Sequence, residues 1–457
     1  MFDFLVRMSR VFHIACPEGD LFAAAGEVTG RLRRAGFMTY WVGGAARDLY
    51  MQRTPADVDM VTVARPDEVK RIFPDAEMVG ACFGVVLVKH RNQVFEIATC
   101  REERAYGDGR RPDEVKFTDD FVLDLQRRDF TCNAMLYDPA GEQLIDYLNG
   151  VNDIDNSILR VVGCPRERFQ EDHLRLFRAV RFASKLGFEL EEECQAALRE
   201  MAGATAVLAA ERVRQELENM LTGADPVRAL ELLKNSGLLK VWLPEVDALA
   251  GVEQYKKYHP EGDVWQHTLL MFQNARKPLD AALAWSILLH DIGKKPTFSC
   301  GEDNIPHFYC HEQVGADMVK DIAGRLRFSG AMADTVEHAV RNHMRFASVC
   351  NMRTAKLRRL LAEADFVMEL ELHRLDCLSS NQLMGTWEFL QARLQSFNST
   401  ALPEPLITGR DLIALGLTPG AEFKTILNAV MDAQLEGVLQ DKASAIEWVI
   451  EKFDIKK

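Results

Sequence analysis

Between residues 38 and 100, apolar and polar positions alternate in short runs that predict strands. The expected strands are MTYWV (38–42), VDMVTVA (58–64), FGVVLVKH (83–90) and QVFEIATC (93–100), with a helix predicted at PDEVKRIF (66–73). A loop rich in Gly, Arg and Pro is expected at YGDGRRPDEVKF (106–117), then a short helix leading into QRRDFTCNAMLYD (126–138). This part of the chain is therefore expected to be a mixed α/β domain.

From about residue 165 the apolar spacing becomes helical. In EDHLRLFRAVRFASKLGF (171–188), apolar residues recur near the helical period and Gly187 closes the pattern. Further helices are expected at LEEECQAALREMAG (190–203), AAERVRQELENMLTG (209–223) and DPVRALELLKNSGLL (225–239). Pro244 predicts a boundary, and residues 260–400 are helical again and rich in histidine. LPEPL (402–406) begins a C-terminal segment with its own helices.

Length and composition limit the classes of protein. A chain of 457 residues predicts two to four domains, and 47% hydrophobic with 27% charged residues is typical of a soluble globular protein. The longest apolar run, 281–289, is far below the roughly 18 residues of a membrane helix. Asp3, Arg7 and Arg10 interrupt the N-terminal apolar patches, which makes a poor signal peptide. Ten cysteines without a C-x-x-C pair favour free thiols in the cytoplasm.

Charge changes the picture at one place. The net charge of −13 argues against general nucleic-acid binding, because phosphate contacts need local positive charge. Residues 158–188, however, contain seven basic and three acidic residues, a net charge of +4. This segment is therefore a candidate contact for phosphate or RNA.

The stretch WVGGAARDLYMQRTPADVDM (41–60) carries the first candidate chemistry. Asp57 and Asp59 are one residue apart on a strand-like pattern, so both carboxylates are expected on one face. Such a pair repels unless a cation lies between them, and Mg²⁺ takes oxygen ligands together with substrate phosphates. Gly43 and Gly44 before a helix let backbone N–H groups approach a phosphate, and Arg47 can reach the same anion. The stretch predicts a metal–triphosphate site.

Three motifs carry a family resemblance. VGGAARD…DVDMVT, RRDFTCNAMLYD and EDHLRLFRAVRFASKLGF resemble the signatures of class II tRNA nucleotidyltransferases (CCA-adding enzymes) and of the related bacterial poly(A) polymerases, over about residues 35–245. The resemblance implies a polymerase-β-like head in which Asp57 and Asp59 bind Mg²⁺ for a two-metal in-line displacement. It assigns the nucleotide phosphates and ribose to Gly44, Arg47 and Arg128, with help from Asp129 and Asn133. Glu96 is placed like a third carboxylate, although a structural ion pair explains it equally well.

The resemblance also implies selection of the base by protein groups. Asp172 and Arg175 are expected three residues apart on one helix face. Asp172 can accept from the exocyclic amine of cytosine or adenine while Arg175 donates to the ring nitrogen, whereas uracil and guanine present a carbonyl instead of the amine. Such a mispairing in a buried polar site costs on the order of several kcal/mol. Arg178 and Arg181 continue the basic face as phosphate contacts, and Glu211 and Arg212 are expected to brace this helix.

A second cluster lies in the histidine-rich half. His290-Asp291 in ILLHDIGK, with a histidine 23 residues upstream, resembles the HD phosphohydrolase superfamily. His and Asp side chains suit Mn²⁺, Fe²⁺, Ni²⁺ or Zn²⁺ with a bound water as nucleophile. His259 and His307 fall outside the pattern. The metal site that the resemblance implies consists of His267, His290, Asp291, His311, His343 and Asp376.

The fold class expected from these motifs is α+β. We expect a catalytic head at 20–150, a helical neck and body binding base and RNA at 151–246, an HD phosphohydrolase domain at 247–400 and a helical tail at 401–457. The expected function is addition of C, C and A from CTP and ATP to the tRNA 3′ end, with phosphate-ester hydrolysis at the HD site. No protein partner and no membrane are expected.

Two alternatives stay open at this point. One is an enzyme that adds only A, either to tRNA ending in CC or as a poly(A) tail. The other is an HD phosphohydrolase whose head binds RNA without catalysis. The loop at 99–117 disfavours addition of CC alone, because family members with that specialisation tend to lack it.

Overall fold

The computed structural model describes residues 9–79, 84–104, 114–301, 305–396 and 402–455. The chain forms two compact units, Met1–Pro244 and Glu245–Lys457, which meet where the sequence predicts a boundary. Among the described residues, no helix is both long enough and apolar enough to cross a membrane. The finer division into four domains stays a prediction.

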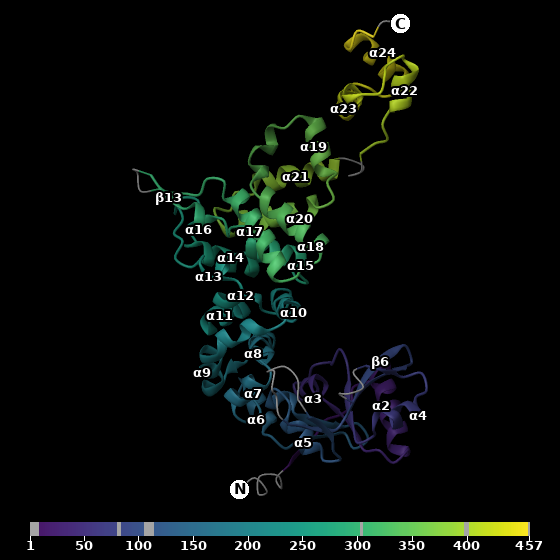
Figure 1. Cartoon of the computed structure of the whole chain (residues 1–457), viewed down its shortest axis with the longest axis vertical. Helices are drawn as coiled ribbons and strands as arrows, with labels where there is room; N and C mark the ends of the chain where they lie inside the picture. The colour runs from purple at the N-terminus through teal and green to yellow at the C-terminus, as the bar shows by residue number, and fades with distance from the viewer. Residues whose placement is uncertain (1–8, 80–83, 105–113, 302–304, 397–401, 456–457) are drawn as a thin grey trace. The chain divides into compact units, whose positions relative to one another are not determined.

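The N-terminal unit contains an eight-stranded sheet (Figure 1). Its strands in spatial order are β1 (Arg10–His13), β10 (Gln143–Asp146), β9 (Met135–Asp138), β2 (Thr39–Val42), β3 (Asp59–Thr62), β6 (Gln93–Thr99), β5 (Val85–His90) and β4 (Glu77–Met78). All neighbouring pairs are antiparallel except β3 and β6, where Met60 faces Ile97. The expected α+β head with a mixed sheet is confirmed.

Two helices pack together against this sheet, α2 (Asp20–Arg34) and α4 (Pro66–Ile72). The Arg31 guanidinium of α2 donates to the carbonyl of Ile72 at 2.6 Å, and Trp41 of β2 donates to Thr29 of α2 at 3.0 Å. The short helix α3 (Gly44–Tyr50) follows β2 directly. Neither β1 nor α2 was among the elements expected from the sequence.

One expected loop contains a strand. β7 (Arg101–Arg104) pairs antiparallel with β8 (Glu114–Phe117), so that Arg101 faces Phe117. The prediction of a loop through residue 117 is therefore wrong at its C-terminal end, because a neighbouring strand supplies backbone partners that a local pattern does not reveal. Residues 105–113 of that loop lie outside the described part of the chain. The short helix α5 (Phe121–Gln126) follows as expected.

The rest of the first unit is helical apart from the short strands β11 (Ile158–Leu159) and β12 (Glu189–Leu190). The central helix α8 is largely buried and ends at Gly187 in the left-handed conformation, as predicted. Its Phe177 ring packs edge-on against Trp242 at 6.3 Å between centroids. The helices are α6 (Gly150–Asp155), α7 (Pro165–Glu171), α8 (Leu174–Leu186), α9 (Glu192–Met201), α10 (Ala210–Leu221), α11 (Pro226–Ser236) and α12 (Leu238–Trp242).

The second unit is helical, with one small hairpin of β13 (Ser299–Cys300) and β14 (Pro306–His307). Helix α13 (Pro244–Asp247) spans the boundary between the units. The helices after it are α14 (Val264–Asn274), α15 (Ala281–Leu289), α16 (Lys294–Thr297), α17 (His311–Arg325), α18 (Gly330–Asn342), α19 (Thr354–Leu361), α20 (Phe366–Ser379) and α21 (Gly385–Ser396). The last three, α22 (Gly409–Ala414), α23 (Ala421–Leu435) and α24 (Lys442–Lys452), have a separate apolar core around Ile426 and Val430.

Candidate active sites

The two aspartates of the head lie at the start of β3. Asp59 is its first residue and Asp57 precedes the strand by two residues. Asp57 and Asp59 are exposed while Val58 and Met60 are buried, so the two carboxylates share the open side. Desolvation and the negative charges of Glu96 and Asp57 raise the pKa of Asp59 to about 6. A nearby cation stabilises the ionised form of a carboxylate whose pKa is raised in this way.

Glu96 belongs to the same group of carboxylates. Because β3 and β6 are parallel and Met60 faces Ile97, Glu96 comes next to Asp59 on the exposed side of the sheet. Within the described residues Glu96 has no ion pair, so the sequence alternative of a structural pair finds no support there. Its charge is instead the strongest electrostatic influence on Asp59.

The glycine turn lies against these carboxylates. Gly43 has a positive φ of 69°, and a methyl group there would lie 3.9 Å from Oδ2 of Asp59 and 3.8 Å from Nη1 of Arg128. The Arg128 guanidinium donates to Asp124 at 3.2 Å, while its Nε is buried without a hydrogen-bond partner. A positive group with an unused donor beside the aspartates suits a phosphate.

Arg47 and Arg178 are held by protein groups. The buried Arg47 donates to Asn133 at 2.6 Å and to Asp48 at 2.8 Å. Arg178 of α8 donates to Asp129 at 2.9 and 2.5 Å. Burial works to raise the pKa of Asp129, but the Arg178 charge and hydrogen bonds outweigh it and lower that pKa. The network ties the RRDFT segment to α8.

Arg181 pairs with Glu216 of α10 at 2.6 Å. The carboxylate partners of Arg178 and Arg181 are therefore Asp129 and Glu216, on other elements. In the part of the chain that the structure describes, neither arginine pairs with Glu167 or Glu171 of the preceding helix α7. Both arginines are therefore engaged in ion pairs with other parts of the first unit.

The placement of Asp172 and Arg175 on one helix is wrong. Asp172 is extended (φ −144°, ψ 105°) and ends α7, and α8 begins only at Leu174. The physical reason is capping, because Oδ1 of Asp172 accepts the backbone N–H of Leu174 at 3.0 Å. Oδ2 accepts from Arg212 at 3.2 Å, so that residue braces the junction as expected. Arg175 donates to Glu171 at 2.5 Å and to the carbonyls of Arg168 and Arg127.

The six predicted metal ligands of the second unit come together from five helices or helix ends. His267 lies in α14, His290 and Asp291 follow α15, His311 opens α17, His343 ends α18 and Asp376 lies in α20. Nε2 of His267 lies 3.2 Å from Asp376, and Nε2 of His290 lies 3.1 Å from Asp291. The Nε2 atoms of His311 and His343 are 3.1 Å apart.

The hydrogen bonds of these histidines fix their tautomers. Nδ1 of His290, His311 and His343 each meets a backbone carbonyl, at 2.9, 2.9 and 2.6 Å. Since a carbonyl only accepts, Nδ1 carries the proton and Nε2 is left as a ligand atom. Nε2 of His267 and of His290 is buried without a hydrogen bond of good geometry. A metal ion would satisfy these orphaned atoms, so the residues fit a metal site.

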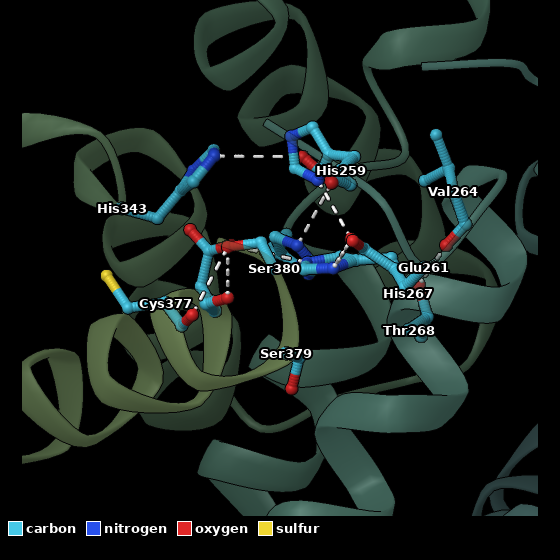
Figure 2. Close-up of polar contacts among 12 residues, drawn as sticks. His259, Glu261, Val264, His267, Thr268, His343, Cys377, Ser379 and Ser380 are labelled. Carbon is cyan, nitrogen blue, oxygen red and sulfur yellow. Dashed lines mark hydrogen bonds and ion pairs between the residues drawn. The ribbon is translucent and has the colours of Figure 1, made fainter. Parts of the chain in front are cut away.

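His267 differs because its Nδ1 meets a carboxylate. Glu261 Oε1 lies 2.7 Å from Nδ1 of His267 and 2.9 Å from Nδ1 of His259, and Figure 2 shows it between the two rings. Burial alone would lower the pKa of His267, but the Asp376 and Glu261 carboxylates raise it to about 9. Sequence reasoning missed Glu261, and no motif spacing pointed to it.

Charge and backbone contact complete this site. Burial tends to raise the pKa of Asp291, yet His290 and Lys294 hold it well below its usual range. Nζ of Lys294 lies 2.6 Å from Asp291 and 2.8 Å from Gln254. Burial and His290 lower the pKa of His343 to about 4, which keeps it neutral as a ligand must be. At Gly293 a methyl group would lie 2.0 Å from the carbonyl oxygen of His311, so only glycine fits there.

A cavity of about 620 Å³ opens onto the ligands Asp291, His311, His343 and Asp376. Its walls include Tyr255, Tyr258, His259, Phe308 and Tyr309. This volume is that of a small-molecule site. A molecule of small size can thus reach these predicted metal ligands through the cavity.

Family models match three parts of the chain. Residues 39–160 match the poly A polymerase head domain, residues 187–249 the probable RNA and SrmB-binding site of polymerase A, and residues 264–367 the HD domain. The last match begins at α14 and includes five of the six predicted ligands, with Asp376 beyond its end.

Sequence relatives cover the chain to different extents. A CCA-adding enzyme of Lactobacillus helveticus is 31% identical over 438 residues, 95% of this chain and 98% of that protein. One from Bacillus velezensis is 42% identical over 233 residues, 51% of this chain and 58% of that protein.

Among solved structures, the Bacillus stearothermophilus CCA-adding enzyme in complex with CTP matches at a TM-score of 0.74 and 27% identity, over 96% of this chain and 98% of that one. The Thermotoga maritima CCA-adding enzyme complexed with tRNA has the same fold, with a TM-score of 0.61 at 20% identity over 97% and 99% of the two chains.

Proposed function

Because the chain belongs to the family of CCA-adding enzymes, we propose that its head adds C, C and A from CTP and ATP to the tRNA 3′ end without a nucleic-acid template. The observation that carries this proposal is the group of exposed carboxylates, Asp57, Asp59 and Glu96, beside the Gly43 turn and Arg128. A site with this excess of negative charge needs cations to admit a triphosphate.

Asp57 and Asp59 would hold Mg²⁺, which would supply the positive charge that a triphosphate needs beside these carboxylates. In the transfer itself the RNA 3′-hydroxyl would attack the α-phosphorus and pyrophosphate would leave. Arg128 would bind the phosphates through its guanidinium, whose Nη1 lies beside the Gly43 turn. The Gly43–Gly44 backbone leaves room for the phosphate, and Gly44 lies near Arg47. The tight bonds of Arg47 to Asn133 and Asp48 hold this arginine in place before the nucleotide arrives.

Asp172 and Arg175 would select the base from the junction between α7 and α8. Each still has hydrogen-bonding capacity, since a carboxylate has about four acceptor positions and a guanidinium five donors. Arg212 holds Asp172 in place and Glu171 holds Arg175 in place. Side chains held in this way favour discrimination between bases by hydrogen bonding. Arg178 and Arg181 would reach phosphates by exchanging their present carboxylate partners.

For the second unit we propose metal-dependent hydrolysis of phosphate esters. His267, His290, Asp291, His311, His343 and Asp376 would hold a transition metal such as Mn²⁺, Fe²⁺, Ni²⁺ or Zn²⁺, which supplies an activated water. The buried Nε2 atoms of His267 and His290 support this choice over Mg²⁺, which prefers oxygen ligands.

Incubation of the protein with tRNA lacking its 3′ end, Mg²⁺ and each labelled nucleotide tests the head. Incorporation of C and A that stops after three residues is the expected result. Incorporation of A alone would support the A-only alternative, and phosphate release without incorporation would support a non-catalytic head. The relatives named above are CCA-adding enzymes, which favours the first outcome.

We also propose that the protein acts in the cytoplasm. The described cysteines are all free thiols, which fits a reducing compartment.

A further inference from the structure

The cavity above the HD ligands has an aromatic wall that the hydrolytic chemistry does not require. The rings of His307 and Tyr309 stack on each other, 5.3 Å between centroids and 12° between planes. Tyr309 is nevertheless 73% exposed, and Tyr258 on the same cavity is 52% exposed. Large aromatic side chains left this open on a cavity wall are candidates for a ligand contact.

The cavity extends from the predicted metal ligands to this aromatic wall. Asp291, His311, His343 and Asp376 belong to the same cavity as His307 and Tyr309. A phosphate bound at the ligands therefore brings whatever it is esterified to into the space that these rings line. The His307–Tyr309 stack is open at the tyrosine end, and a further planar ring would continue it.

We propose that Tyr309 is a specificity-determining residue that stacks on the nucleobase of the HD substrate, so that this site takes nucleoside phosphates in preference to phosphate esters without a base. The inference rests on the proposed hydrolase function and deepens it. A polar group on the cavity wall favours a nucleobase over a plain phenyl ring, because a base has hydrogen-bonding atoms at its edge. Asn381 lines the cavity, and its Oδ1 accepts the N–H of Leu383 at 3.1 Å, which leaves its amide N–H groups as donors.

The cavity is also the right size for such a ligand. Its volume of about 620 Å³ lies well within the range for small-molecule sites. Nζ of Lys294 lies 5.6 Å from the centroid of the Phe308 ring, between the ligand Asp291 and the aromatic wall. A positive charge there suits the phosphate end of a nucleotide, and the exposed rings suit the other end.

A matched pair of substrates tests the proposal on the full chain loaded with Mn²⁺. Adenosine 2′,3′-cyclic phosphate and glycerol 1,2-cyclic phosphate contain the same reacting five-membered ring, and the glycerol compound lacks the ribose and the base. For Tyr309→Ala we expect KM for the adenosine compound to rise about tenfold or more, with kcat nearly unchanged, because stacking on one base contributes a factor of this order. KM for the glycerol compound should not move, and Tyr309→Phe, which keeps the ring, should behave as wild type.

An equal change in KM for both substrates, or none for either, would overturn the proposal while leaving the hydrolase intact. If the wild type hydrolyses neither compound, the proposed hydrolase function fails instead. Stacking is then judged by calorimetric titration with adenosine 3′-monophosphate and ribose 5-phosphate. The proposal requires Tyr309→Ala to weaken binding of the first only, and an unchanged isotherm rejects it.

Discussion

The two sites of this protein differ in how much of them exists before a ligand arrives. In the head, Asp57, Asp59 and Glu96 are exposed and repel one another. In the HD site, the histidines and Asp291 are buried and already face one another within 3.1–3.8 Å. The first arrangement suits a cation that enters and leaves with the nucleotide, and the second suits a resident ion.

The difference teaches how one chain can support two metal chemistries. Oxygen ligands on the exposed side of a sheet favour Mg²⁺ with substrate phosphates, whereas buried imidazoles with fixed tautomers favour transition metals. Each proposed activity should then fail separately.

The strongest test of the division is a pair of alanine substitutions. Asp59→Ala should lower nucleotide addition by about a thousandfold or more, because one oxygen ligand and its charge are lost, and leave hydrolysis of cyclic phosphate unchanged. Asp291→Ala should do the reverse. Labelled nucleotide incorporation and phosphate release measure the two activities. A folded variant that loses both would contradict the separation of the sites.

A smaller effect is expected on base selection in the head. Arg175→Ala should reduce discrimination against UTP and GTP by about a hundredfold, since a donor to the ring nitrogen is lost. The measurement compares kcat/KM for the four nucleotides on tRNA ending at the discriminator base. Arg166→Ala is the control, because Arg166 lies on the neighbouring helix α7, is exposed, and pairs with Glu200 of α9. Unchanged selectivity in Arg175→Ala would refute its assignment.

The HD site offers a test of the carboxylate behind one ligand. Glu261→Gln keeps an acceptor for His267 but removes the charge, and should weaken Mn²⁺ binding by about tenfold. Calorimetric titration of the metal-free protein measures it. Glu312→Gln is a matched control, because Nδ1 of His311 already donates to Phe308 and lies 3.7 Å from Glu312. Equal weakening in both variants would remove the special role of Glu261.

The smallest expected effect is on stability. The pKa of Asp59 is about 6 in the folded protein against 3.8 as its ordinary value, so the ionised form destabilises the fold above pH 6 and this cost disappears below about pH 4. An unscreened shift of this size corresponds to about 3 kcal/mol. Because Asp59 is exposed, we expect Asp59→Asn to raise the free energy of unfolding by about 1 kcal/mol at pH 7.5 without Mg²⁺.

Urea titrations at pH 7.5 and pH 4 measure this change. The gain should be present at the first pH and absent at the second. A gain of equal size at both would mean that the asparagine stabilises by a route other than relief of repulsion.

Elements that depend on interactions between neighbouring residues were predictable from the sequence, whereas elements that depend on distant partners were harder to predict. The strands around Trp41 and Phe95 and the helix ending at Gly187 were predictable, because periodic burial and a helix-ending glycine are local signals. Helix α2 was missed, although Phe22, Ala25, Val28 and Leu32 of its buried face recur close to the helical period. The strand β8 depends on pairing with β7, which no local pattern shows.

The candidate sites divide in the same way. The six HD positions were predictable from motif order, and the structure brings five of them into close groups, with Asp376 3.2 Å from His267. The helix break at Asp172 was not, because a carboxylate that caps Leu174 looks in sequence like one on a helix face. Glu261 and Lys294 gain their roles only from distances to His267 and Asp291. The roles of the six HD residues as metal ligands, and of Asp172 and Arg175 in base selection, remain predictions for the assays above.

The contact at Gly293 has a consequence for the choice of ion. The backbone after Asp291 rests directly on the carbonyl of His311, so main-chain contact sets how closely the backbones of these two predicted ligands approach. A side chain at position 293 would push the two backbones apart. A change in the size of the ion would therefore be met by the side chains of Asp291 and His311, while the glycine between them is kept.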